Sequence, residues 1–486
     1  MPNTVAYLAL LLWPLVVILM FRRMPIERAL IWSILGGYLF LPPVARFDFP
    51  MVPALDKVSI PNLSTLFVIA VMLRERVELI PRTRAVQALL LLFLFGPLIT
   101  VLNNREPILF GQIVTEWSVT RYPGATVQDA LQGLRIYDAV AFIGNQLIYI
   151  LPFFLARQFL ASAAALREVL IALVIAGLIY SVPMLIEARL SPQLNTWIYG
   201  FFQHSFAQTI RWGGFRPIVF LQHGLWLAFF TLMCVVAAAT LARAAAPERR
   251  PRMILATIYL LVMLVVCRSM GPLVHAAALL PLVLLASPRV QLRAAALLAM
   301  VTVAYPLLRG AGLVPVDTLL GLAEAFSEER AGSLRFRFDN EAMLLAHASE
   351  KPLFGWGGWG RNMVHDMISG EMLTIVDGRW IIVIGTHGWL GYIAEFGLLA
   401  LPVLMLAHAA ARLPASEVSP YGAAIALLVG ANMIDLLPNA TLIPFTWLMA
   451  GAVLGHAERL RATGTAEPEP VPNRVPDRAS RPRTVL

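Results

Sequence analysis

Long apolar stretches follow one another along almost the whole chain, and they restrict its fold more than any other feature. A hydrocarbon core about 30 Å thick takes about 20 helical residues to cross. Backbone inside that core must satisfy its own hydrogen bonds, which leaves helices or a closed barrel. The stretches are continuous rather than alternating, which excludes a barrel. Spans are predicted at roughly 4–21, 29–43, 61–73, 85–102, 138–156, 168–186, 217–241, 253–267, 270–287, 293–308, 387–408, 420–436 and 441–457.

Composition agrees with a membrane protein. Hydrophobic residues make up 59% of the 486 residues and charged residues 14%, with a mean hydropathy of +0.73. A soluble domain is closer to half apolar and a quarter charged. The two cysteines both fall in apolar stretches and offer neither a disulfide framework nor a metal cluster. The expected fold is all-α: a polytopic transmembrane bundle of about 12–14 helices, with no cofactor, no metal and no nucleic-acid partner.

Basic residues predict the orientation of the chain. Arginines occupy every alternate short connector, at 22–28, 74–84, 157–167, 243–252, 289–293 and 412. By the positive-inside rule these connectors face the cytoplasm, so the longer connectors 44–60, 103–137, 187–216 and 309–386 face outward. The predicted parts are a bundle of about ten spans at 1–308, a large periplasmic loop at 309–386, C-terminal spans at 387–458 and a disordered cytoplasmic tail at 459–486.

Arginines near the outer ends of spans are candidate anion ligands. Arg211 and Arg216 end one outer connector, and Arg268 stands at a Gly-Pro break between two spans. Arg335 and Arg337 alternate in the large loop, so their side chains would share a side if that stretch is extended. A guanidinium group binds phosphate oxygens in a fixed, two-pronged geometry, which suits a lipid-linked diphosphate. The alternative is that these arginines reach into headgroups or solvate loops.

A glycine-tryptophan segment in the same loop is a candidate substrate contact. Glycine permits tight turns and close backbone approach, and tryptophan favours the membrane interface or stacks on sugar faces. The alternative is a structural turn that anchors the loop. The candidate substrate-loop residues are Gly355, Trp356, Gly358 and Arg361.

The predicted span that begins at His387 carries the candidate catalytic residues. His387, Gly391 and Glu395 recur every four residues and so lie near one stripe of a helix. A histidine at the interface can act as a base near neutral pH. Glu395 lies two turns deeper, where an ionisable group is a functional candidate by default. The alternatives are an ordinary interfacial histidine and a carboxylate paired with an arginine of a neighbouring helix.

Three motifs, in this order, resemble those of the O-antigen ligase and polymerase superfamily, the Wzy-C type membrane glycosyltransferases. Cys267-Arg268-Ser269-Met270-Gly271-Pro272 resembles the family's Ser-Arg-Gly break. The segment from Arg335 through Pro352-Leu353-Phe354-Gly355-Trp356-Gly357 resembles the one that ends in "P-L-x-G-x-G". His387-Gly388-Trp389-Leu390 through Glu395-Phe396-Gly397-Leu398 resembles the "H-N-x-x-L…E-x-G-L" helix. The match covers about 250–405.

The resemblance implies a metal-independent inverting transferase in the bacterial inner membrane. Its donor would be a glycan on undecaprenyl diphosphate at the periplasmic face, and its acceptor a glycan or lipid A-core. Arginines would hold the diphosphate, with Arg268 as the best positional match and Arg211 or Arg216 as the arginine of the earlier loop. The histidine at the loop–helix junction would activate the acceptor hydroxyl.

The histidine motif departs from the family pattern, and several readings stay open. In the family the histidine is followed by Asn, Ser or Gln and lies one residue further from the glutamate. Either one residue is missing here, or Thr386 stands in the histidine's place and His387 in the next. The expected function is that of a polymerase for capsule or exopolysaccharide, or of an O-antigen ligase. The alternatives are a transporter or flippase for a lipid-linked or anionic solute, and a non-catalytic membrane component of a polysaccharide system.

Overall fold

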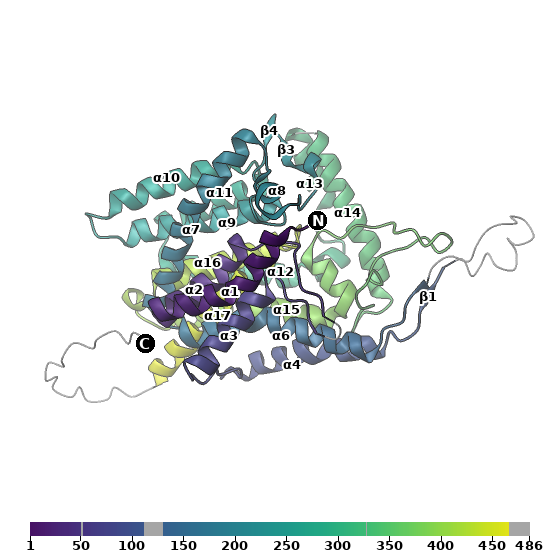
Figure 1. The fold of residues 1–486 in the computed structure, drawn as a ribbon, viewed down its shortest axis with the longest axis horizontal. Coiled ribbons are helices and arrows are strands. Elements are labelled where there is room, and N and C mark those ends of the chain that lie inside the picture. Colours follow the sequence, from purple (N-terminus) through teal and green to yellow (C-terminus); the bar gives the residue numbers. More distant parts are fainter. Residues whose placement is uncertain (50–51, 111–129, 327, 466–486) are drawn as a thin grey trace, which may run out of the picture.

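The computed structural model describes residues 1–49, 52–110, 130–326 and 328–465, and these are mostly helical (Figure 1). The α-helices are α1 (Thr4–Arg23), α2 (Ile26–Phe40), α3 (Ser59–Phe67), α4 (Arg84–Leu102), α6 (Ile136–Phe159), α7 (Ala163–Leu190), α8 (Leu194–Tyr199), α9 (Gly224–Ala244), α10 (Arg250–Val266), α11 (Met270–Leu285), α12 (Pro288–Gly310), α13 (Val316–Phe326), α14 (Glu328–Ser349), α15 (Arg379–Ala411), α16 (Pro420–Asp435) and α17 (Pro444–Thr465). A π-helical turn, η1 (Val68–Met72), extends α3, and η2 (Phe206–Thr209) and η3 (Ala415–Glu417) are 3-10 turns. Two short antiparallel ladders pair β1 (Ile108–Leu109) with β2 (Ala130–Leu131) and β3 (Ile210–Arg211) with β4 (Gly214–Phe215).

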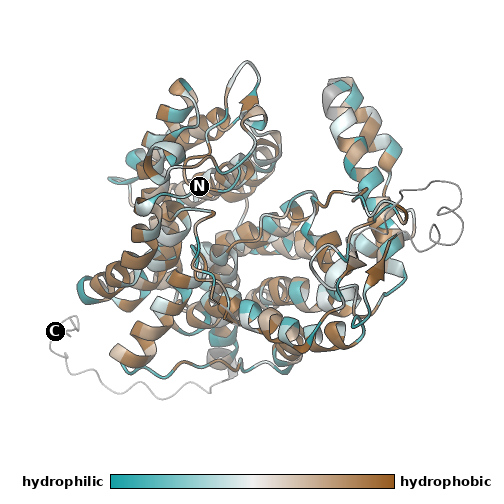
Figure 2. Cartoon of the chain, turned by 45° about the vertical axis from the view of Figure 1, so that its right-hand side comes forward, coloured by the Kyte–Doolittle hydropathy of each residue, from teal (hydrophilic) through white to brown (hydrophobic). Residues whose placement is uncertain are grey.

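Every predicted span falls on a helix, and seven of these helices are long and apolar enough to cross a membrane. The seven are α1, α4, α6, α7, α9, α12 and α15, and shorter apolar helices cover 59–72, 270–285 and 420–435. Hydrophobic residues cover most of the bundle helices (Figure 2). Large apolar side chains such as Leu11 (63% exposed) point outward on α1, as they do on a helix that faces lipid. The chain is therefore a helical membrane protein, while the count of 12–14 spans stays a prediction.

Three predicted boundaries were wrong. The helix expected to begin at 217 begins at Gly224, after an extended segment in which Val219 has a positive φ. The predicted polar loop 309–386 contains α13, α14 and the first two turns of α15, because the run Trp380–Ile384 is apolar and packs into the core. The tail predicted from 459 remains helical to Thr465 in α17, and 466–486 lie outside the described residues.

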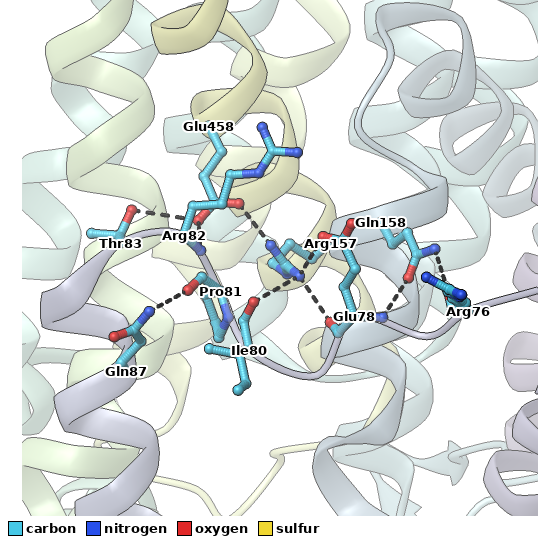
Figure 3. Close-up of polar contacts among 10 residues, drawn as sticks. All are labelled: Arg76, Glu78, Ile80, Pro81, Arg82, Thr83, Gln87, Arg157, Gln158 and Glu458. Carbon is cyan, nitrogen blue, oxygen red and sulfur yellow. Dashed lines mark hydrogen bonds and ion pairs between the residues drawn. The ribbon is translucent and has the colours of Figure 1, made fainter.

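A buried arginine joins α6, α17 and the connector before α4 (Figure 3). Arg157 donates from Nη1 to Oε2 of Glu458 at 2.9 Å and from Nη2 to the carbonyl oxygen of Glu78 at 2.8 Å. The other carboxylate oxygen of Glu458 accepts from the backbone N–H of Arg82 at 3.0 Å. A buried charge is tolerated when it is paired and hydrogen-bonded in this way.

The contacts of the basic connectors place them at one end of the bundle. Arg28 pairs with Glu168 at 2.8 Å, Arg157 with Glu458 at 2.9 Å, and Arg289 donates to the carbonyl oxygen of Leu413. This is the end where α17 finishes, on the left of Figure 1, whereas β1, α13 and α14 lie on the right. The predicted grouping of the connectors is consistent with this arrangement. Which end faces the cytoplasm stays a prediction.

Candidate functional site

A break inside α15 lies at the centre of the candidate site. Gly388 has φ 67° and ψ −169°, a conformation that glycine adopts and other residues avoid, so α15 consists of two helices joined end to end. The break leaves backbone N–H and C=O groups on either side of Gly388 without helical partners. Within the membrane such groups need other partners.

The segment 352–357 supplies those partners. Backbone N–H groups of Trp356 and Gly357 donate to carbonyl oxygens before the break, and carbonyls of Pro352 and Leu353 accept from N–H groups after it. The four hydrogen bonds are Trp356 N to Gly385 O (2.8 Å), Gly357 N to Thr386 O (2.9 Å), Trp389 N to Pro352 O (2.7 Å) and Leu390 N to Leu353 O (3.2 Å). The "P-L-x-G-x-G"-like segment and the histidine motif therefore form one structural unit.

Glycines make this close approach possible. A Cβ atom on Gly355 would lie 2.6 Å from the backbone nitrogen of Gly388, and one on Gly388 would lie 2.3 Å from the carbonyl carbon of Leu353. The side chain of Trp356 stacks on His347, with ring centroids 4.4 Å apart, and its Nε1 donates to the carbonyl oxygen of His347 at 2.9 Å. Gly358 also packs closely, because a Cβ atom added to it would lie 3.2 Å from the ring of Phe142.

The guanidinium group of Arg361 joins two main-chain segments by hydrogen bonds. It is buried, and it donates from Nε to the carbonyl oxygen of Trp356 at 3.2 Å and from Nη1 to that of Gln132 at 3.0 Å. Burial lowers the pKa of Arg361 from its ordinary value. The predicted substrate-loop residues are therefore adjacent to the break, and the contacts of Trp356 and Arg361 are with the protein itself.

His387 stands at the end of the first half of α15. His387, Gly391 and Glu395 line one cavity of about 10 Å³, room for about one water molecule, so the three positions share a side as the spacing predicted. A Cβ on Gly391 would lie 2.2 Å from Cβ of His387, so the small residue is required there. The Nδ1 atom of His387 is buried and has no hydrogen-bond partner among the residues that the structure describes.

Glu395 is paired with Arg379, a residue that the sequence interpretation missed. Arg379 Nε and Nη2 donate to the two carboxylate oxygens of Glu395, each at 2.6 Å, which is a bidentate pair. Glu395 is 4% exposed and Arg379 is 31% exposed at the side chain. The partner expected on a neighbouring helix thus comes from the other half of the same broken helix. A charged residue directly before the apolar run Trp380–Ile384 was the signal that could have found it.

Three predicted arginines converge at a hairpin. Trp212 and Gly213 both have positive φ, the geometry of a two-residue hairpin turn, which joins β3 to β4. Arg268, itself at φ 49° between α10 and α11, donates from Nη1 to the carbonyl oxygens of Arg211 (2.5 Å) and Trp212 (2.7 Å). A Cβ at Gly214 would lie 2.3 Å from Nη2 of Arg268, so glycine opens the space for the guanidinium group.

Arg216 lies beside this hairpin and is buried. Its Nη2 donates to Oγ of Ser269, the residue after Arg268, and its Nε has no hydrogen-bond partner within the described part of the chain. Burial, together with the nearby positive charge of Arg211, lowers the pKa of Arg216 to about 10. In the described residues no carboxylate forms an ion pair with Arg211, Arg216 or Arg268. The three form a cationic cluster, the hairpin arginines.

The expectation that Arg335 and Arg337 share a side was wrong, because both lie in α14, where residues two apart point to different sides. Arg335 pairs with Glu324 of α13 at 2.9 Å, and both side chains are exposed. Arg337 pairs with Asp377 at 3.2 Å, directly before α15. Arg337 also lies within electrostatic range of His223, which is in range of Arg216 and Arg211. Arg337 therefore stands between the hairpin arginines and the start of α15, and Arg335 does not.

Glu341, also missed by sequence reasoning, connects α14 to α12 and α15 and predicts a pH dependence. Its carboxylate accepts from Nε1 of Trp380 and from the hydroxyl of Tyr305, both at 3.4 Å, with Nε of Arg309 3.8 Å away. Burial raises the pKa of Glu341 to about 7 despite these contacts. Between about pH 4.5 and pH 7 the carboxyl group of Glu341 therefore keeps its proton in the folded state. In the unfolded state, where its pKa has the ordinary value of 4.5, the proton is released.

Stability is therefore expected to decrease as the pH rises from about 4.5 to about 7. The measurement is the thermal unfolding midpoint of the detergent-solubilised protein across that range. Glu341→Gln, which stays neutral, is expected to flatten this part of the profile. An identical slope in wild type and Glu341→Gln would contradict the assignment.

Fold and site together define a helical membrane protein with a broken helix and a cationic cluster that has no carboxylate partner among the described residues. No protein-family model matches the chain, and no curated protein sequence matches it. The resemblance to the O-antigen ligase and polymerase superfamily therefore rests on the motifs and their arrangement, and it stays a prediction.

Proposed function

We propose that the protein is a metal-independent inverting glycosyltransferase that polymerises or ligates glycans carried on undecaprenyl diphosphate at the periplasmic face of the inner membrane. The observation that carries this proposal is the cluster formed by Arg211, Arg216 and Arg268. These residues come from two connectors that contact each other, through Arg268 and the main chain of Arg211 and through Arg216 and Ser269, and they have no carboxylate partner in the described chain. Like charges held together repel one another, and a diphosphate would relieve that repulsion with two-pronged hydrogen bonds.

The proposed mechanism is a single displacement. The acceptor hydroxyl oxygen attacks the anomeric carbon of the donor sugar as the bond from that carbon to the diphosphate oxygen breaks. The hydroxyl proton passes to a base at the break in α15, for which His387 is the candidate. The negative charge that grows on the leaving diphosphate is stabilised by the hairpin arginines, which are already in place before the reaction.

Arg337 and Arg379 extend the site from the hairpin toward His387. Arg337 is in electrostatic range of His223 beside the hairpin, and its partner Asp377 precedes Arg379 by two residues. Arg379 in turn holds Glu395, which lines the cavity of His387. Charged groups therefore occur between the proposed leaving-group site and the proposed base.

Glycan output tests the proposal. A deletion strain would be complemented with wild type, Arg268→Ala, Arg268→Lys, His387→Ala or Arg46→Ala, and its lipopolysaccharide and extracellular polymer analysed by size. Arg268→Ala is expected to reduce long polymer about 100-fold or more, the usual cost of losing one preorganised charge stabiliser. Arg268→Lys keeps the positive charge but not the two-pronged geometry of a guanidinium group, so its polymer output should be intermediate. Arg46 is an exposed arginine paired with Asp48, and its replacement should leave output unchanged. Normal polymer from an inserted Arg268→Ala protein would overturn the proposal.

A transporter for a lipid-linked or anionic solute is the second candidate. Transporters commonly bind their solutes where helices are broken within the membrane, and α15 is broken at Gly388. Reconstitution with isolated lipid-linked glycan separates the two functions. Formation of longer glycan without an ion gradient supports the transferase, and movement of unaltered glycan across the bilayer supports the transporter.

A further inference from the structure

A second cavity lies between α2, α3, α6, α9 and α17 and has a volume of about 250 Å³. Its wall lies beside the segment that leads from β4 into α9, since Lys57 contacts that segment. Ligand pockets for drug-sized molecules begin near 300 Å³, so this cavity suits a group the size of one ring. The lining residues used below are Tyr38, Asp56, Lys57, Asn62, Tyr149 and Trp226.

Lys57 is an unusual residue for this chain, in which only two of the 38 basic residues are lysines. It is 6% exposed, lies over the ring of Tyr38 at 5.7 Å and donates to the carbonyl oxygen of Phe220 at 3.0 Å. An ammonium group has three donors, and this is the one hydrogen bond it makes with the described residues. Burial lowers the pKa of Lys57 to about 7, and nearby Asp56 acts in the opposite direction.

Acceptor atoms in the same cavity also lack protein partners. Asn62 is 1% exposed, and its Nδ2 donates to the carbonyl oxygen of Ile148 at 2.8 Å, but its Oδ1 is buried without a partner among the described residues. Leaving such an atom unsatisfied costs about 1–3 kcal/mol. Asp56 uses Oδ1 to bind the N–H groups of Val58 and Ser59, and its Oδ2 accepts none of the hydrogen bonds seen in the described chain.

Aromatic rings complete the cavity. Tyr38 and Trp226 lie nearly parallel with ring centroids 6.3 Å apart, and Trp226 is half-buried. The cavity thus combines an aromatic wall, donors and acceptors, and one charge of each sign. A phosphate would be repelled by the carboxylate of Asp56, and an acyl chain would leave the polar atoms without hydrogen-bond partners. An uncharged ring with several hydroxyl groups can stack on the aromatic side chains and also form hydrogen bonds with the polar atoms.

Tyr149 relates this cavity to the neighbourhood of α15. It lines the cavity and is within electrostatic range of Asp56, Arg379 and Glu395. We propose that the cavity binds one uncharged sugar ring of the glycan, next to the site where transfer takes place. The inference rests on the proposed function, because it supplies the sugar-recognition part of that site.

Ligand-induced thermal stabilisation of the purified, full-length protein tests the inference. The probes are glucose and N-acetylglucosamine for the cavity, glucuronic acid and inorganic phosphate as anionic comparators, and farnesyl diphosphate for the hairpin arginines. The variants are Lys57→Gln, Trp226→Leu and Arg268→Ala. Gln222→Ala, an exposed residue at the cavity, serves if the other cavity variants fail to fold. Trp197→Leu, an exposed tryptophan of α8, is the matched control.

A neutral sugar is expected to raise the unfolding midpoint of wild type, Arg268→Ala and Trp197→Leu by a few degrees. It should leave the midpoints of the cavity variants unchanged. Absence of any neutral-sugar effect on wild type, a larger effect of glucuronic acid or phosphate, or an equal effect on the cavity variants overturns the inference. Farnesyl diphosphate reports separately on the proposed function: it should stabilise Trp226→Leu but not Arg268→Ala, whatever the sugars do.

Discussion

Gly388→Ala is expected to prevent the packing of α15 against the segment 352–357. Gly388 has a φ of 67°, and an alanine Cβ there would lie 2.3 Å from both the carbonyl carbon and the carbonyl oxygen of Leu353. These are main-chain atoms held by hydrogen bonds, so they cannot move aside as a flexible side chain would. Strained backbone and displaced main chain together should cost on the order of 3 kcal/mol or more. The measurement is the yield of monodisperse protein after detergent extraction, with its unfolding midpoint.

Gly96→Ala is the matched control for this prediction. Gly96 lies inside α4, and a Cβ added there would meet no atom within 4 Å. Alanine in a helix interior should be neutral or stabilise by about 0.5–1 kcal/mol. A Gly388→Ala protein with the yield and midpoint of wild type would show that the break is not held as described.

Arg379→Met is expected to destabilise the protein by about 3–5 kcal/mol, because it leaves the carboxylate of Glu395 buried without a partner. Glu395 is 4% exposed and both its oxygens accept from Arg379. Arg379 itself is 31% exposed at the side chain, so water offsets part of the loss and the lower end of that range is expected. The measurement is the shift in the thermal unfolding midpoint.

The double variant Arg379→Met/Glu395→Met separates structure from function. Replacing both members of a buried pair with apolar residues is often close to neutral for stability, so the double variant should regain most of the midpoint. Its polymer output should remain low if the pair positions His387 for transfer. A double variant as unstable as Arg379→Met alone would show that the ion pair does not account for the loss.

Much of the fold could be predicted from apolar runs because a membrane span is a local property. Length and hydropathy of a stretch decide whether it can cross, so each predicted span falls on a helix. Alternating arginines predicted a grouping of the connectors that is consistent with the arrangement of the helices. The boundary predicted at 386 was wrong because burial outweighs local polarity there. Trp380–Ile384 was assigned to the loop because polar residues surround it, yet it packs into the core as helix.

The candidate site, too, could be predicted only in part from the sequence. Arg211, Arg216 and Arg268 were found because their residue type and placement suit an anion, but their convergence depends on the β3–β4 hairpin. Arg335 and Arg337 looked equivalent in sequence, and the helical geometry of α14 sends them to different partners. Lys57 and Arg379 carried no motif at all. Their roles come from a cavity wall and an ion pair that join segments distant in the chain.

The sequence by itself determined that this protein is a bundle of membrane helices, with arginines near the ends of its predicted spans and a histidine–glutamate stripe. These are one-dimensional properties, set by composition and by the period of a helix. The tertiary structure alone decided that α15 is broken at Gly388 and that the segment 352–357 supplies the missing hydrogen bonds. It also decided which buried charge meets which partner. Those outcomes depend on long-range packing, because each backbone and charged group removed from water must find its partner wherever the fold brings one.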